Sequence, residues 1–180
     1  MDAAFADSAH RSGAMLACRP GCTQCCVGAF SVNALDAARL REGMHWLATA
    51  DPQRAAEIRE RAINYVQAYA GDFPGDPETG VLGESEEAQQ RFDDFANDAV
   101  CPALDPINGT CQLYEHRPMT CRVFGPPVTT EDGLGHCELC YIGASEEAVQ
   151  ACEMHVPHEL EAELLTDFDE SKTIVAYCLL

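Results

Sequence analysis

The sequence predicts a mainly α fold, a small single domain of about five helices around an irregular cysteine-rich centre, with one short β-hairpin. Two observations lead to this prediction. Several segments repeat apolar residues at helical spacing. Nine of the eleven cysteines also fall into two groups, at residues 18–26 and 101–140, with no cysteine between the groups. A chain of 180 residues with 47% hydrophobic content can bury a core of this kind.

Three helices are predicted between the two cysteine groups. They span about residues 34–48, 52–70 and 85–99. Asn33 or Ser31 can cap the first helix, Asp51 can cap the second, and Ser85 can cap the third. Along each segment apolar residues recur every three or four positions, so each helix should bury one face.

The two ends of the chain differ in character. Residues 1–14 are small and polar with no apolar period, and we expect a loose tail there. Ser145 and Pro157 mark the starts of two further helices in a C-terminal helical part, residues 145–180. Its last segment, residues 173–180, is apolar and predicts a short strand or a docked tail.

The hairpin is predicted inside the second cysteine group. Asn108 followed by Gly109 is a strong signal for a tight turn. The turn would pair residues 101–105 with residues 110–114 and bring Cys101 near Cys111. A polar loop over residues 129–135 should then lead to the last two clustered cysteines.

The charge of the chain restricts its partners. Thirty acidic residues against eleven basic ones give a formal charge of −19. This field repels phosphate backbones and anionic lipid surfaces, so we expect neither a nucleic acid nor a membrane partner. A basic protein partner is compatible with it. The N-terminal residues do not resemble a signal peptide, and we expect the protein in the cytoplasm.

The cysteines are expected to bind metal. Disulfides are rare in a reducing compartment, and clustered thiols there more often bind metal. Cys-x2-Cys, the spacing of a metal knuckle, occurs twice. Thiolates suit zinc and iron–sulfur clusters, and the number of thiols allows one four-cysteine site with spares or two sites. The candidate ligands are Cys18, Cys22, Cys25, Cys26, Cys101, Cys111, Cys121, Cys137 and Cys140.

Three residues near these ligands or outside their groups have other expected roles. Arg122 directly follows Cys121, and we expect its cation to stabilise the bound cluster from just outside the ligands. Cys152 and Cys178 lie on apolar faces and are expected to be buried core thiols.

The order and spacing of these residues resemble a known family. The segments that carry the resemblance are Cys18-Arg-Pro-Gly-Cys22-x2-Cys25-Cys26, Cys101-Pro-x-Leu-Asp and Asn-Gly-x-Cys111-x2-Tyr114-Glu115-x-Arg117-Pro118-x2-Cys121-Arg122-x-Phe124. Over residues 18–140 the chain resembles the YkgJ-like CxxCxxCC cysteine cluster family, a zinc- or iron-chelating domain. The first gap holds three residues where the family name implies two.

The resemblance implies a metal or cluster ligand role for the seven cysteines in these segments, with Cys137 and Cys140 matching the trailing cysteines less specifically. A related array occurs in the longer flagellin lysine methylases, for which iron–sulfur chemistry is favoured. Three interpretations follow. The first is a [4Fe–4S] protein in electron transfer, redox sensing or support of a partner enzyme. The second is a structural zinc module. The third is an enzyme, either methylase-like or using Cys26 or Cys121 as a nucleophile.

Overall fold

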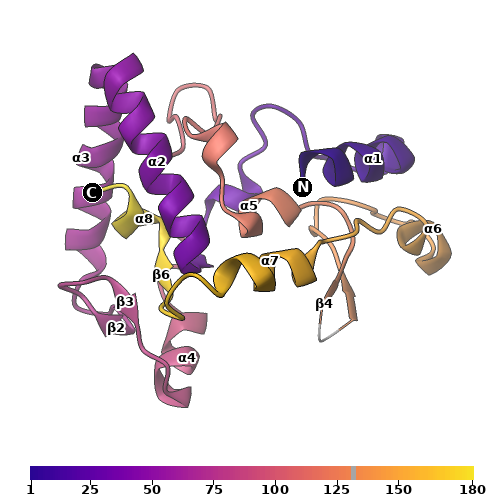
Figure 1. The fold of residues 1–180 in the computed structure, drawn as a ribbon. Helices are drawn as coiled ribbons and strands as arrows, with labels where there is room; N and C mark the ends of the chain where they lie inside the picture. The colour runs from indigo at the N-terminus through magenta and orange to yellow at the C-terminus, as the bar shows by residue number, and fades with distance from the viewer. Residues whose placement is uncertain (131–132) are drawn as a thin grey trace.

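The computed structural model describes residues 1–130 and 133–180. Its fold is mainly α, as predicted (Figure 1). The α-helices in the described residues are α1 (Asp2–Ser12), α2 (Ala34–Ala50), α3 (Pro52–Tyr69), α4 (Glu86–Asp93), α5 (Met119–Val123), α6 (Glu146–Gln150), α7 (His158–Leu165) and α8 (Val175–Cys178). Short antiparallel pairs join β1 (Ser31–Val32) to β6 (Thr173–Ile174), β2 (Gly75–Asp76) to β3 (Val81–Leu82), and β4 (Val128–Thr130) to β5 (Gly133–Gly135).

Helices α2 and α3 form a hairpin that holds the main core, and α8 packs against both (Figure 1). The predicted caps are in place. The side chain of Asn33 accepts a hydrogen bond from the Asp36 N–H at 2.9 Å, and that of Asp51 accepts one from the Arg54 N–H at 3.1 Å. The core cluster includes Leu40, Met44, Leu47, Ala55, Ile58, Ala62 and Leu179, which are all buried. The predictions for these two helices are confirmed.

The third predicted helix is shorter than expected. Helix α4 ends at Asp93, and the chain continues in turns. Ala96 has a φ of 51°, which a helix cannot include. Phe95 and Ala99 are still buried, against Phe73. The apolar pattern therefore identified the buried residues correctly but not the end of the helix.

The prediction of a loose tail over residues 1–14 is wrong, because α1 covers most of that segment. Ser8 donates a hydrogen bond to the carbonyl of Cys152 at 2.5 Å, and the hydroxyls of Ser12 and Tyr141 lie 2.5 Å apart. Both serines are buried. These two partners, Cys152 and Tyr141, lie more than 120 residues away in the chain, so no local pattern could reveal them.

The predicted turn at Asn108 forms, but without regular strands. Gly109 adopts a positive φ of 69°, as a tight turn requires. The N–H of Asp105 donates to the carbonyl of Thr110, and the N–H of Gln112 donates to that of Ala103, both at 2.8 Å. This pairing gives one bridge, between Leu104 and Cys111, and no strand over residues 101–105 or 110–114. Strands β4 and β5 pair antiparallel where a polar loop was expected over residues 129–135. Positions 131 and 132 of that predicted loop lie outside the described residues.

Strand β1 follows the first cysteine group and pairs with β6, near the end of the chain. Ser31 lies opposite Ile174, and Val32 lies opposite Thr173. The segment over residues 173–180 is thus a short strand followed by α8. Among the described residues, no helix combines the length and the apolar character that crossing a membrane requires.

Candidate metal centre

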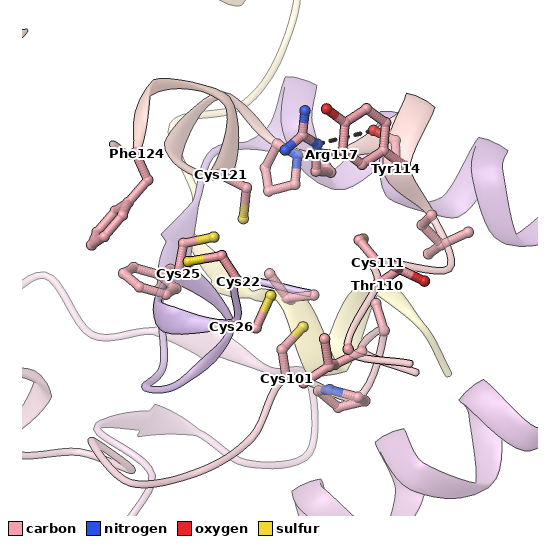
Figure 2. A pocket seen from close by; sticks show the side chains of 18 of the residues that line it. Cys22, Cys25, Cys26, Cys101, Thr110, Cys111, Tyr114, Arg117, Cys121 and Phe124 are labelled. Atoms are coloured by element: carbon pink, nitrogen blue, oxygen red, sulfur yellow. Dashed lines mark hydrogen bonds between the residues drawn. The ribbon is translucent and has the colours of Figure 1, made fainter. Parts of the chain in front are cut away.

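Seven of the nine candidate ligands line one cavity of about 500 Å³. They are Cys18, Cys22, Cys25, Cys26, Cys101, Cys111 and Cys121. Figure 2 shows the thiols of Cys25, Cys26, Cys101 and Cys121 pointing into an open space. The two cysteine groups, far apart in the sequence, therefore meet in the fold.

Backbone contacts hold the two groups together. The N–H of Cys101 donates to the carbonyl of Cys26 at 2.8 Å, and Val27 and Val100 form an antiparallel bridge beside this bond. The bridge between Leu104 and Cys111 places Cys111 at the same cavity. These contacts use main-chain groups, so the cavity wall is built by the backbone as well as by the thiols.

Cys121 reaches the cavity from α5. This five-residue helix is too short to be stable alone. The buried side chain of Asp36 on α2 accepts a hydrogen bond from the N–H of Met119, the first residue of α5, at 2.7 Å. Helix α2 thereby fixes the start of α5 and, two residues on, the position of Cys121.

Cys137 and Cys140 do not line the cavity. Both are buried in a hydrophobic cluster, and Cys18 packs against that cluster from the edge of the cavity. The N–H of Ala17 donates to the Cys140 sulfur at 3.4 Å. The structure thus places the trailing cysteines beside the beginning of the first group.

Burial governs the protonation of the cavity thiols. It raises the pKa of Cys101 to about 12 and also raises the pKa values of Cys111 and Cys121. The Cys26 thiol donates a hydrogen bond to Cys25, which lowers the pKa of Cys25 to about 6 and raises that of Cys26. Burial therefore favours the neutral form of the Cys26 and Cys121 thiols, and a neutral thiol is a poor nucleophile.

A bound cation would change this balance. A thiol binds metal as a thiolate, and the metal supplies the positive charge that burial otherwise denies it. As the side chains stand, no three His, Cys, Asp or Glu groups within residues 1–130 and 133–180 converge closely enough to hold one ion. The cavity thiols therefore do not converge on one point, and binding of a single ion there would require side-chain rotation.

The arginine that lines the cavity is Arg117, and Arg122, for which the sequence predicted a role beside the ligands, does not line it. Arg117 lines the cavity, and its guanidinium carbon lies 3.7 Å from the centroid of the Tyr114 ring. Its charge opposes the effect of burial on the pKa values of Cys111 and Cys121.

Arg122 is buried, and its donors are used elsewhere. It donates to the carbonyl of Arg117 at 2.9 Å and to that of Glu115 at 2.5 Å, and it pairs with the carboxylate of Asp2. Arg122 therefore positions the segment that carries Arg117. Both arginines are visible beside Cys121 in the sequence, but only the fold shows which one reaches the thiols.

The two remaining cysteines are core residues, as expected. Cys152 and Cys178 are each 2% exposed. The Cys178 thiol donates to the carbonyl of Ile174 at 3.6 Å, within its own helical turn.

A mainly α fold that gathers nine cysteines from two distant segments defines a cysteine-cluster protein. The family model CxxCxxCC, described as "Putative zinc- or iron-chelating domain", matches residues 17–153. The chain belongs to this family. A search of curated proteins and a search of solved structures gave no match.

Proposed function

We propose that the cavity binds a [4Fe–4S] cluster through four of five thiols, those of Cys25, Cys26, Cys101, Cys111 and Cys121. The observation that carries this proposal is the arrangement of these thiols around a cavity of about 500 Å³. Four thiolates on such a cluster are the common ligand set, and a cluster fills space that a single zinc ion would not.

The chain's own residues have separate tasks in this proposal. The thiols bind the irons, and Arg117 provides a positive charge beside them. Apolar groups such as Phe124 and Ala103 line the same cavity and limit the access of water. The cluster, when bound, supplies one-electron chemistry, which suits electron transfer, redox sensing or support of a partner enzyme. Because the thiols must stay reduced, the proposal places the protein in a reducing compartment such as the cytoplasm.

The experiment is anaerobic purification followed by measurement of iron, acid-labile sulfide and zinc per chain. We expect iron and sulfide in equal amounts and a visible sulfide-to-iron absorption band. The double variant Cys101→Ala/Cys111→Ala should lose the band, the iron and the sulfide. The control variant Cys152→Ala/Cys178→Ala removes the two core thiols and should keep them. If the protein instead contained zinc without sulfide, and the same cavity variant lost that zinc, the cavity would hold a structural zinc site and not a cluster.

A further inference from the structure

Cys137 and Cys140 form a turn that is separate from the cavity. The N–H of Cys140 donates to the carbonyl of Cys137 at 2.9 Å, which is the compact geometry of a Cys-x2-Cys knuckle. Both side chains are buried, at 7% and 2% exposure, and neither lines the cavity. The two thiols are therefore buried together within one hydrophobic cluster.

Three contacts bring Cys18 to this knuckle. The N–H of Ala17 donates to the sulfur of Cys140 at 3.4 Å. The N–H of Cys137 donates to the carbonyl of Gly125 at 3.2 Å. A Cβ atom added to Gly125 would lie 2.5 Å from the Cys18 sulfur, so this sulfur rests directly on the Gly125 backbone. Cys18 and the knuckle therefore both lie against Gly125, and Ala17, next to Cys18, contacts the knuckle.

Cys22 completes the group. Its N–H donates to the carbonyl of Arg19 at 2.9 Å, in a turn that includes Gly21 at a φ of 88°. This turn folds the chain back between Cys18 and Cys22. Gln24, two residues after Cys22, donates a hydrogen bond to the carboxylate of Glu138 at 2.8 Å, which brings this segment beside the knuckle.

Packing separates the two sets of thiols. Cys18 packs against the hydrophobic cluster that holds Cys137 and Cys140. Cys101 and Cys111 pack instead against the core cluster of α2 and α3.

We propose that Cys18, Cys22, Cys137 and Cys140 form a second metal site, distinct from the cluster site, that binds one zinc ion. Only the assignment of the other five thiols to a cluster depends on the proposed function. Two Cys-x2–3-Cys pairs from distant segments are the usual ligand set of a closed, tetrahedral, structural zinc site. The amide of Ala17 would donate to a bound thiolate, as groups around such ligands commonly do.

Binding requires the sulfurs to move together and to lose their protons. Each cysteine has one side-chain torsion to its sulfur, and rotation about it can close the four thiols on one ion. The zinc ion keeps its oxidation state, and the thiol protons that binding displaces pass to solvent. The site would join the chain before β1 to the segment after β5. It would also support α1, because Tyr141, next to Cys140, contacts Ser12.

The test compares two double variants and measures zinc and iron per chain in each. The variant Cys137→Ser/Cys140→Ser should lose one equivalent of zinc and keep the metal of the cavity. The variant Cys101→Ser/Cys111→Ser should lose the cavity metal and keep that zinc. Loss of both metals together from either variant, with far-ultraviolet circular dichroism unchanged, would overturn the second site. So would a wild-type protein with metal at one site only.

These outcomes are distinct from a failure of the proposed function. Two independently lost equivalents of zinc, with no iron or sulfide, would support two sites and refute the cluster. Iron lost only from the cavity variant, with no zinc in any preparation, would support the cluster and refute the zinc site.

A glycine pair tests the second site without removing a ligand. Gly125→Ala places a methyl group against the Cys18 sulfur, whereas Gly133→Ala places one where no described residue lies within 4 Å. Both glycines have positive φ, 121° and 115°, so both variants carry similar backbone strain. We expect Gly125→Ala to weaken zinc binding at least about tenfold relative to Gly133→Ala. Equal zinc affinity in a competition titration would overturn the proposal.

Discussion

Arg117 is held in place by its neighbours rather than by an acidic partner. Its guanidinium lies over the Tyr114 ring, and its Nε donates to the Tyr114 carbonyl at 3.1 Å. Arg122 donates to the Arg117 carbonyl from the other side. No salt bridge in the described residues neutralises Arg117, so its charge acts on the thiols beside it. A cation so placed favours the more negative, reduced form of a cluster.

We predict that Arg117→Ala keeps iron and sulfide but shifts the reduction potential to a more negative value. An effect on the order of 1–2 kcal/mol is expected for a charge about 10 Å away at an effective dielectric constant of about 20. Arg117→Lys should restore most of the potential, because it keeps the charge. The measurement is a spectroscopic redox titration. Unchanged potential in Arg117→Ala would show that its charge does not reach the cluster.

At the scale of residues, the sequence predicted which cysteines come together better than it predicted their surroundings. The sequence named nine candidate cysteines, and seven of them line the cavity. The prediction named Arg122, but Arg117 is the arginine that lines the cavity, because adjacency to Cys121 in the chain says nothing about the direction of a side chain in a short helix. Arg122 points instead to Asp2, a contact between residues 120 positions apart.

At the scale of elements, the contact between α2 and α5 positions Cys121. Asp36 supplies this contact through its bond to the Met119 N–H, and it is buried at 7% exposure. Burial raises the pKa of Asp36, and the bond from Met119 opposes that effect only in part. The folded state therefore holds the Asp36 proton more tightly than the unfolded state does. Stability contributed by this group is present at low pH and is lost as pH rises from 3.8, the ordinary pKa of an aspartic acid, through the raised pKa.

We predict opposite effects for two substitutions of Asp36. Asp36→Asn keeps an acceptor for Met119 and cannot ionise, so its unfolding free energy should gain on the wild type as pH rises through this window. Asp36→Ala leaves the N–H without its acceptor and should lose about 1–2 kcal/mol at neutral pH. Denaturant unfolding at several pH values measures both. A constant difference between Asp36→Asn and the wild type across pH would contradict the account.

Elements with a local signal were predictable, and those with distant partners were not. Helices α2 and α3 carry caps and apolar stripes within their own residues, and both were predicted. Helix α1 is held by hydrogen bonds to Cys152 and Tyr141, and nothing within its own residues predicts these partners. The Asn-Gly turn formed, but the segments on either side of it do not form strands. They place Cys101 and Cys111 in the cavity wall.

At the scale of the molecule, the cysteines close long loops. A metal bound by Cys26 and Cys101 would cross-link residues about 75 positions apart, which in the loop-entropy model is worth roughly 4 kcal/mol. The second site would close an even longer loop, from Cys22 to Cys137. The hairpin of α2 and α3 and the helix α4 all lie within these loops (Figure 1). Metal binding and the packing of these helices should therefore support each other.

The most direct test of cysteine ligation is X-ray absorption spectroscopy at the iron and zinc edges of one anaerobic preparation. The account predicts a sulfur shell around iron with a second shell of iron scatterers, and zinc with four sulfurs at about 2.3 Å. Oxygen or nitrogen ligands as the main shell of both metals would contradict it, because the clustered cysteines would then not hold the metal.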